Sequence, residues 1–181
     1  MKILAISGSL RSSSVNTSLL RAAAGLAPLN VNFTIYEGLA DLPHFNPELD
    51  NEIPPISVTN LRQQLGTSDG VIICTPEYAY GMPGVLKNAL DWIVSSGELV
   101  GKPVVTISAS PSDLGGSQAH ASLRLTLTAL AANMVEGGEL TVGFVTKKIN
   151  GLGEIKDSQL LQALTSTIEM LVQNIQSQLP R

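Results

Sequence analysis

The stretch SGSLRSSSVN, at residues 7–16, gathers chemical groups that bind anions. Gly8 leaves main-chain amides accessible, the serines add hydroxyl donors, and Arg11 adds a guanidinium. A helical pattern of leucine and alanine starts at Asn16, and a helix N-terminus attracts negative charge. These features predict a site for a phosphate monoester. The alternative is that the serines only cap the helix while Arg11 lies in solvent.

The stretch TPEYAYGMPG, at residues 75–84, is typical of a loop that packs against a flat ring. Its prolines restrict the backbone, its glycines let main chain approach a ligand, and its tyrosines supply aromatic faces. The alternative is a turn packed only by its own side chains. Glu77 is compatible with a ligand contact and equally with an ion pair across a subunit boundary.

A third loop, SASPSDLGGSQA at residues 108–119, places Gly115 and Gly116 ahead of a helical pattern. We expect it to offer a second set of main-chain N–H donors, directed at the pyrimidine side of a ring. A simple helix-entry turn would have the same sequence.

The elements that position these loops follow from alternating apolar runs and helical patterns. Strands are predicted at 2–7, 31–36, 70–75, 102–110 and within 134–146. Helices are predicted at 16–27, 55–66, 85–96, 117–134 and 157–178.

This alternation predicts a parallel sheet with helices on both faces. With a phosphate-type loop after the first strand, we expect the flavodoxin-like order 2-1-3-4-5 in a single domain over residues 1–181. The chain reverses direction between strands one and three of that order. Loops 8–15 and 76–84 should therefore face each other across one crevice, with loop 110–116 beside them.

Composition excludes several classes of protein. The net charge of −4 leaves no basic stripe to neutralise phosphates, so we expect no nucleic-acid partner. No apolar run approaches the length of a membrane span, so we expect no membrane partner. The single cysteine, Cys74, ends an apolar run and is predicted to be a core residue of a cytoplasmic protein.

Motifs for other chemistries are missing from the chain. No G-x-x-x-x-G-K-[ST], G-x-G-x-x-G or G-x-S-x-G motif occurs. The two histidines, His44 and His120, have no metal-ligand spacing, so we expect no metal site. We expect a structural role for His44 and a surface or interface position for His120.

The segments GSLRSSSVN and PEYAYGMPGVLKNALDW closely resemble the NADPH-dependent FMN reductase family, which includes quinone, chromate and azo-dye reductases. The family patterns are G-S-x-R-x-x-S-x-N and P-E-Y-N-x-x-x-P-G-x-L-K-N-A-x-D-W, and the resemblance covers about residues 2–133. This chain departs from the family at Ala79, where Asn is usual, and at Gln118, where Arg is frequent.

The resemblance implies bound FMN, with NADPH or NADH as electron donor. The residues that it places around the FMN phosphate are Ser9, Arg11, Ser14, Asn16 and Thr17. Those that it places along the isoalloxazine are Pro76, Glu77, Tyr78, Ala79 and Tyr80, with Gly116 near the other edge of the ring.

The implied activity is transfer of hydride from NADPH through FMN to a small acceptor such as a quinone, free flavin or chromate. The cofactor carries the reaction, so we predict no catalytic side chain. Two alternatives remain, a flavodoxin-like FMN electron carrier without nicotinamide turnover and a flavin-free binding module of the same fold.

The predicted helix at 85–96 has two apolar faces. One contains Val85, Ala89 and Trp92, and the other contains Leu86, Leu90 and Ile93. One face suffices to cover a sheet, so the second suggests a partner helix, and the resemblance implies a homodimer or homotetramer built there. A larger core would explain the second face equally.

Overall fold

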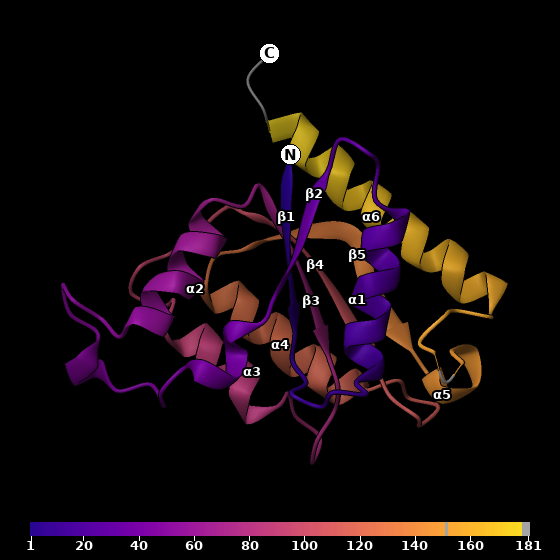
Figure 1. The fold of residues 1–181 in the computed structure, drawn as a ribbon, viewed down its shortest axis with the longest axis horizontal. Coiled ribbons are helices and arrows are strands. Elements are labelled where there is room, and N and C mark those ends of the chain that lie inside the picture. Colours follow the sequence, from indigo (N-terminus) through magenta and orange to yellow (C-terminus); the bar gives the residue numbers. More distant parts are fainter. Residues whose placement is uncertain (151, 179–181) are drawn as a thin grey trace.

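Five parallel strands form one sheet in the order β2-β1-β3-β4-β5 in the computed structural model, which describes residues 1–150 and 152–178 (Figure 1). This is the predicted flavodoxin-like order. The strands are β1 Lys2–Ser7, β2 Asn32–Tyr36, β3 Gly70–Thr75, β4 Pro103–Ala109 and β5 Asn133–Val142.

Helices cover both faces of the sheet (Figure 1). They are α1 Val15–Leu26, α2 Ile56–Gly66, α3 Gly84–Asp91, α4 Ser117–Ala129, α5 Val145–Lys148 and α6 Ser158–Gln178, with short 3-10 turns η1 Gly38–Asp41 and η2 Pro47–Leu49. One apolar cluster joins the sheet to α1 and α6, and a second joins it to α2, α3 and α4. None of the helices described here is long and apolar enough to cross a membrane.

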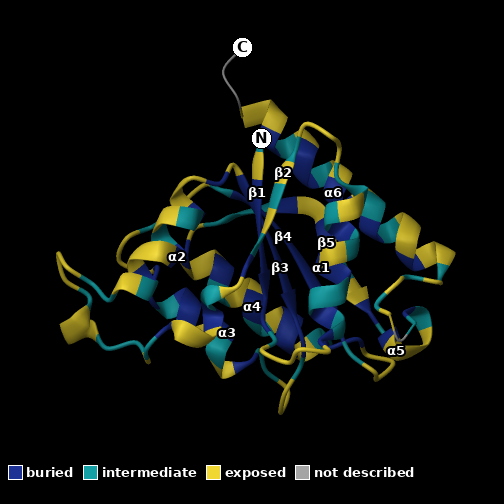
Figure 2. Ribbon diagram, viewed as in Figure 1, coloured by how far each residue is buried: buried dark blue, intermediate teal, exposed yellow. Residues whose placement is uncertain are grey.

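The central strands are apolar because both of their faces are covered. Every residue of β3 and β4 is buried, whereas β2 at the edge alternates between more and less exposed positions (Figure 2). The register pairs Ser7 with Cys74 at the end of β1, and Thr75 with Ser108 at the end of β3. The carboxyl ends of these strands therefore meet at one edge, from which the three predicted loops leave.

Two helices end earlier than their apolar patterns predict. After α3, the main-chain carbonyl of Trp92 accepts hydrogen bonds from Nε and Nη2 of Arg62, at 3.1 and 2.6 Å. The carbonyl thus has a side-chain partner, and the segment continues as turns. After α4, Ala131 has φ +52° and the amide of Ala132 returns to the carbonyl of Leu127, which closes the helix.

The sequence EGGE, which made the limits of the fifth strand uncertain, forms an irregularity inside β5. The register shifts between the pairs Val104–Met134 and Thr106–Glu139, and Gly137 takes φ +73°. A bulge of this kind interrupts the alternation of side chains that marks a strand in sequence. The strand begins at Asn133, one residue before the predicted segment.

The argument for a partner helix at α3 is not supported by its packing. Leu86, Leu90 and Ile93 are buried within the chain, and so are Ala89 and Trp92 of the other apolar face. A larger core, which was the alternative explanation, therefore accounts for both faces except at Val85, which is only half-buried. The two-faced pattern therefore carries no information about oligomeric state.

Candidate active site

The loop after β1 is folded by its own serines. The hydroxyl of Ser14 accepts a hydrogen bond from the amide of Thr17 at 3.3 Å and so caps α1, as the capping alternative anticipated for the serines. The amide of Ser14 donates to the carbonyl of Arg11 at 3.1 Å, which closes a turn. The loop is thereby held directly at the N-terminus of α1.

Several donors of this loop stay free of protein partners. Within residues 1–150 and 152–178, the guanidinium of Arg11 forms no ion pair or hydrogen bond. In the same part of the chain, the amides of Ser12 and Ser13 donate to no protein acceptor. A cation and free amides beside the positive end of α1 form a suitable donor set for a phosphate dianion.

A cavity of about 180 Å³ brings the first two loops together. Of the predicted cofactor residues, those that line it are Ser9, Arg11, Ser14, Asn16, Pro76, Glu77 and Tyr78. The predicted residues outside its lining are Thr17, Ala79, Tyr80 and Gly116. The crevice expected between loops 8–15 and 76–84 is therefore present.

Two of the predicted phosphate residues use their side chains within the protein. The hydroxyl of Thr17 pairs with that of Ser7 at 2.8 Å. The buried Oδ1 of Asn16 accepts from Sγ of Cys74 at 3.2 Å, and burial raises the pKa of the Cys74 thiol. Cys74 is thus a neutral core residue, as predicted, that fixes the Asn16 side chain under the loop.

The far wall of this cavity comes from two segments, and sequence reasoning anticipated one of them. Ala109, Ser110 and Pro111 belong to the third loop, which was expected beside the other two, whereas Val145 and Thr146 follow β5 and were missed. Those after β5 lie beyond the resembling segment and carry no motif. Their one available signal was topological, because the carboxyl ends of all parallel strands open toward the same edge.

The second loop is a tight hairpin. The amide of Tyr78 donates to the carbonyl of Gly81 and the amide of Gly81 to the carbonyl of Tyr78, both at 3.0 Å. Between them, Ala79 and Tyr80 have φ of +49° and +62°, which defines a type I′ turn. Asn suits the first position of this turn because it tolerates the left-handed region better than alanine does. The turn conformation therefore explains why the family usually has Asn where this chain has Ala79.

Ala79→Asn is expected to stabilise the protein by about 0.5–1 kcal/mol, because Asn relieves the strain of a left-handed alanine. The same change should tighten FMN binding or leave it unchanged. Urea unfolding and flavin fluorescence titration measure the two effects. Ala131→Asn, at another left-handed alanine that lines neither cavity of the site, is the matched control: it should stabilise the fold without changing FMN affinity. A loss of stability in Ala79→Asn would contradict the assignment of the turn.

The carboxylate of Glu77 makes a contact within its own chain that the sequence did not suggest. Its Oε2 accepts hydrogen bonds from the amides of Gln118 and Ala119, at 2.9 and 3.0 Å. These amides belong to the first turn of α4. Glu77 therefore joins the hairpin loop to the third loop of the site within one chain.

The third loop enters α4 through two left-handed glycines. Gly115 and Gly116 have φ of +61° and +82°, and Gly116 is the N-cap residue of α4. A Cβ at Gly115 would lie 2.6 Å from Cγ2 of Thr141 and 2.8 Å from the amide nitrogen of Gly143. Only glycine fits this position.

His120 is buried, which corrects the prediction that it lies at the surface or in an interface. Its Nε2 lies 2.7 Å from Oγ1 of Thr106, and its Nδ1 lies 3.0 Å from Oγ1 of Thr141 and 3.2 Å from Oγ of Ser108. Burial lowers the pKa of His120, the Glu139 carboxylate opposes this shift, and the Arg124 cation adds to it. The ring thus ties α4 to the last two strands behind the third loop.

This burial predicts a pH dependence of folding stability. The pKa of His120 is lower in the folded chain than in the unfolded chain, so stability is full above the unfolded value of about 6.5 and falls as the pH drops below it. The contribution of His120 to the slope should not exceed about 1.4 kcal/mol per pH unit, the limit for one titrating group. Urea unfolding between pH 8 and 5 measures it.

The matched pair of variants for this test is His120→Gln and His44→Gln. Glutamine at position 120 removes the buried titrating group and should flatten the pH dependence. His44 is exposed, so His44→Gln should keep the dependence of the wild type. An identical pH dependence in His120→Gln and the wild type would show that His120 is not its source.

A second, more apolar cavity of about 400 Å³ adjoins the first. The two share Arg11 and Tyr78. Its remaining lining comes from the first loop and the start of α3: Gly8, Leu10, Pro83, Gly84 and Val85. Leu10 and Tyr80 are exposed around this region, so the carboxyl edge of the sheet presents apolar side chains to solvent.

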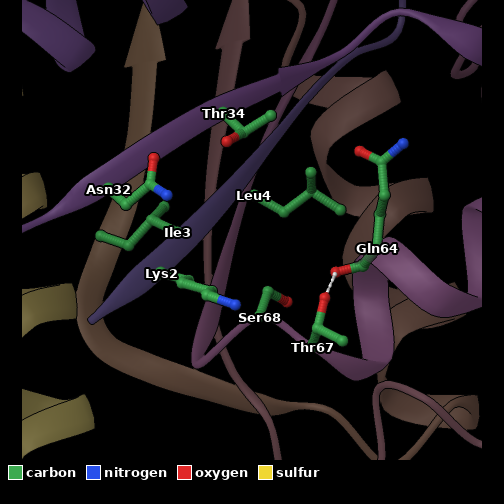
Figure 3. A pocket seen from close by; sticks show the side chains of 8 residues that line it. All are labelled: Lys2, Ile3, Leu4, Asn32, Thr34, Gln64, Thr67 and Ser68. Atoms are coloured by element: carbon green, nitrogen blue, oxygen red, sulfur yellow. Dashed lines mark hydrogen bonds between the residues drawn. The ribbon is translucent and has the colours of Figure 1, made fainter.

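A cavity at the opposite edge offers no comparable chemistry. It occupies about 210 Å³ at the amino ends of β1 and β2, where Figure 3 shows its eight lining side chains. Lys2 is the one charged residue among them. The hydroxyl of Thr67 donates a hydrogen bond to the carbonyl of Gln64 within the same lining. In the described part of the chain, no three His, Cys, Asp or Glu side chains gather as a metal site.

The residues of the carboxyl edge fit FMN. The free donors at Arg11, Ser12 and Ser13 suit its phosphate, and the left-handed main chain at Gly115 and Gly116 can approach a ring edge without side chains in between. The fold and this site define a flavodoxin-like flavoprotein. Ligands of such folds bind at the carboxyl ends of the strands, where the chain reverses direction.

Comparisons with known proteins agree with this class. The model of the family described as NADPH-dependent FMN reductase matches residues 1–147, so the chain belongs to the NADPH-dependent FMN reductase family. The quinone reductase of Escherichia coli K12 is 32% identical over 180 residues, covering 97% of this chain and 96% of that one. An NAD(P)H-dependent FMN reductase of Pseudomonas aeruginosa is 31% identical over 173 residues, covering 94% and 93%.

Solved structures give the same result. The flavoenzyme NAD(P)H:(acceptor) oxidoreductase FerB of Paracoccus denitrificans superimposes with a TM-score of 0.87 at 29% identity, and the match covers 97% of each chain. An FMN-dependent azoreductase of Bacillus anthracis, solved with FMN, shares the fold with a TM-score of 0.60 at 16% identity over 97% of this chain and 100% of that one. The chain is therefore an FMN-dependent NAD(P)H oxidoreductase rather than a flavodoxin-like electron carrier.

Proposed function

We propose that this chain binds FMN across its three carboxyl-edge loops and reduces quinone-type aromatic acceptors with NAD(P)H. The observation that carries the proposal is the pair of adjoining cavities, one with phosphate donors and one mostly apolar, which share Arg11 and Tyr78. Relatives named quinone reductase and 2-hydroxy-1,4-benzoquinone reductase support this acceptor class.

The chain's own residues bind and orient the cofactor. Arg11 and the amides of the first loop hold the phosphate, and the Tyr78–Gly81 hairpin lies along the ring. The main chain at Gly116 faces the other edge. Bound FMN would supply the hydride chemistry between NAD(P)H and the acceptor.

In this proposal the apolar cavity, of about 400 Å³, holds one flat partner at a time. Leu10, Pro83 and Val85 give it an apolar lining that suits a nicotinamide or a quinone, and Arg11 at its border favours an anionic substituent. NAD(P)H and the acceptor would thus occupy the same place in turn, which is a ping-pong scheme.

Steady-state kinetics tests the proposal. Initial rates with NADPH and NADH, measured against a panel of quinones, free flavin and chromate, should give parallel double-reciprocal lines and the highest kcat/KM for quinones. Intersecting lines would show that donor and acceptor bind together. Purified chain that is colourless after incubation with FMN and desalting would contradict flavin binding itself.

We further propose that a second copy of the chain covers the apolar cavity, in a homodimer or a homotetramer. The exposed side chains of Leu10, Tyr78 and Tyr80 at its border support this, because exposed apolar groups gathered at one place commonly mark an interface. Light scattering of the purified chain tests it, and a monomer at micromolar concentration would contradict it. The buried free thiol of Cys74 is consistent with a cytoplasmic location.

A further inference from the structure

The first turn of α4 has main-chain amides that are not capped by the side chain of its own N-cap residue. Its N-cap residue, Gly116, has no side chain to accept from them. A helix N-terminus leaves its first amides without helical partners and carries a partial positive charge. In most helices a Ser, Thr, Asp or Asn at the N-cap meets both needs.

Glu77 meets these needs from 41 residues away in the sequence. Its Oε2 accepts from the amide of Gln118 at 2.9 Å and from that of Ala119 at 3.0 Å. Two amides thus share one carboxylate oxygen, and the carboxylate lies at the positive end of the helix. Glu77 therefore caps the N-terminus of α4 from a distant part of the same chain.

The same contact brings two walls of the site together. A Cβ at Gly116 would lie 3.4 Å from Cβ of Glu77, so the left-handed entry to α4 packs directly against the hairpin loop. Glu77 precedes Tyr78, whose main chain opens the hairpin, and it also lines the cavity with the phosphate donors. Moving Glu77 would therefore move both loops.

We propose that Glu77 is a positioning residue of the flavin site, which sets the separation of the hairpin loop from α4 and neutralises the positive end of that helix. The proposal rests on the proposed binding of FMN between these loops. Reduction adds negative charge to the flavin, which an unopposed helix N-terminus would stabilise. With the carboxylate in place, the flavin keeps a lower reduction potential, which favours passing electrons on to the acceptor.

Two substitutions separate the geometric part from the electrostatic part. Glu77→Ala removes both hydrogen bonds, whereas Glu77→Gln keeps an acceptor oxygen of the same shape and removes the charge. Glu136→Gln, at an exposed glutamate in the irregular part of β5, is the matched control for charge. The measurements are amide hydrogen exchange of Gln118 and Ala119 without flavin, FMN affinity, and the midpoint potential of bound FMN.

Glu77→Ala should speed exchange of both amides at least about tenfold and weaken FMN binding about tenfold, by loss of a charge-assisted cap. Glu77→Gln should change exchange and affinity for oxidised FMN much less. It should bind reduced FMN about tenfold more tightly relative to oxidised FMN, which raises the two-electron potential by about 30 mV. Glu136→Gln should match the wild type in all three.

Several results would overturn the inference. Unchanged exchange in Glu77→Ala would show that the cap does not form. Weaker FMN binding in Glu77→Gln, with exchange unaffected in both variants, would make Glu77 a direct flavin ligand instead. Faster exchange with an unchanged potential in Glu77→Gln would remove the electrostatic role. Wild-type protein that binds no FMN would overturn the proposed function and the flavin role together, whereas the exchange measurement would still decide the cap.

Discussion

Arg11→Ala is expected to weaken FMN binding about 10- to 100-fold while changing riboflavin binding less than about twofold. A charge-assisted pair between a guanidinium and a phosphate contributes about 1.5–3 kcal/mol, and only FMN carries the phosphate. The guanidinium has no competing partner among the described residues, so its loss should leave the fold intact. Fluorescence titration of apoprotein with each flavin measures both affinities.

Arg124→Ala provides the matched control for Arg11. Arg124 is an exposed arginine of α4 that lines neither cavity of the site, and its ion pair with Glu139 is itself exposed. Its loss changes the net charge by the same amount and should leave FMN affinity within about twofold. Equal weakening of FMN and riboflavin by Arg11→Ala would show that Arg11 does not bind the phosphate.

Gly115→Ala is expected to lower the free energy of unfolding by at least about 3 kcal/mol. The added Cβ would lie 2.6 Å from Cγ2 of Thr141, 2.8 Å from the amide of Gly143 and 2.9 Å from the carbonyl carbon of Val142. Two of these atoms are main chain and cannot turn away, so β5 or the third loop must shift. Urea denaturation of the purified variant measures the loss.

Gly101→Ala separates the clash from backbone strain. Gly101 has φ +66°, close to the +61° of Gly115, but no atom lies within 4 Å of its added Cβ. Alanine there should cost only the strain of a left-handed residue, about 1 kcal/mol. Equal losses in the two variants would mean that the contacts around Gly115 relax without cost.

The sheet could be predicted from the sequence because its central strands carry a simple pattern. The runs at 2–7 and 70–75 are apolar on both faces, and such runs separated by helical segments leave few topologies. The end of α3 could not be predicted in the same way. It depends on Arg62, which reaches the carbonyl of Trp92 from another helix, and no local preference encodes that hydrogen bond.

The candidate site, like the fold, could be predicted where its residues are close together in the sequence and not where they are far apart. The phosphate loop was recognisable because its donors are contiguous in the chain and precede a helix. The cap that Glu77 provides joins residues 41 positions apart, and only the missing side chain at Gly116 hints that a partner is needed. His120 was misplaced although it shares a helical stripe with Leu123 and Leu127, both buried, which was a usable signal of burial.

The glycines of the second loop leave open space beside the main chain. Gly81 and Gly84 were expected to permit close approach of main chain to a ligand. Within the protein, a Cβ at Gly81 would meet nothing nearer than the carbonyl oxygen of Tyr78 at 3.8 Å, and one at Gly84 would meet nothing within 4 Å. The backbone strain of the loop is instead at Ala79 and Tyr80, which no glycine marks.

The only tryptophan of the chain gives it a built-in optical reporter. Trp92 is fully buried, its ring meets Phe45 edge-on at 5.1 Å between centroids, and its indole nitrogen donates to the carbonyl of Pro43 at 2.8 Å. Its emission therefore reports whether segment 43–45 is packed against the end of α3, on the face of the sheet that α2, α3 and α4 cover. Tryptophan fluorescence and the absorbance of a bound flavin would thus follow two different parts of one molecule, and their unfolding midpoints can be compared in a single sample.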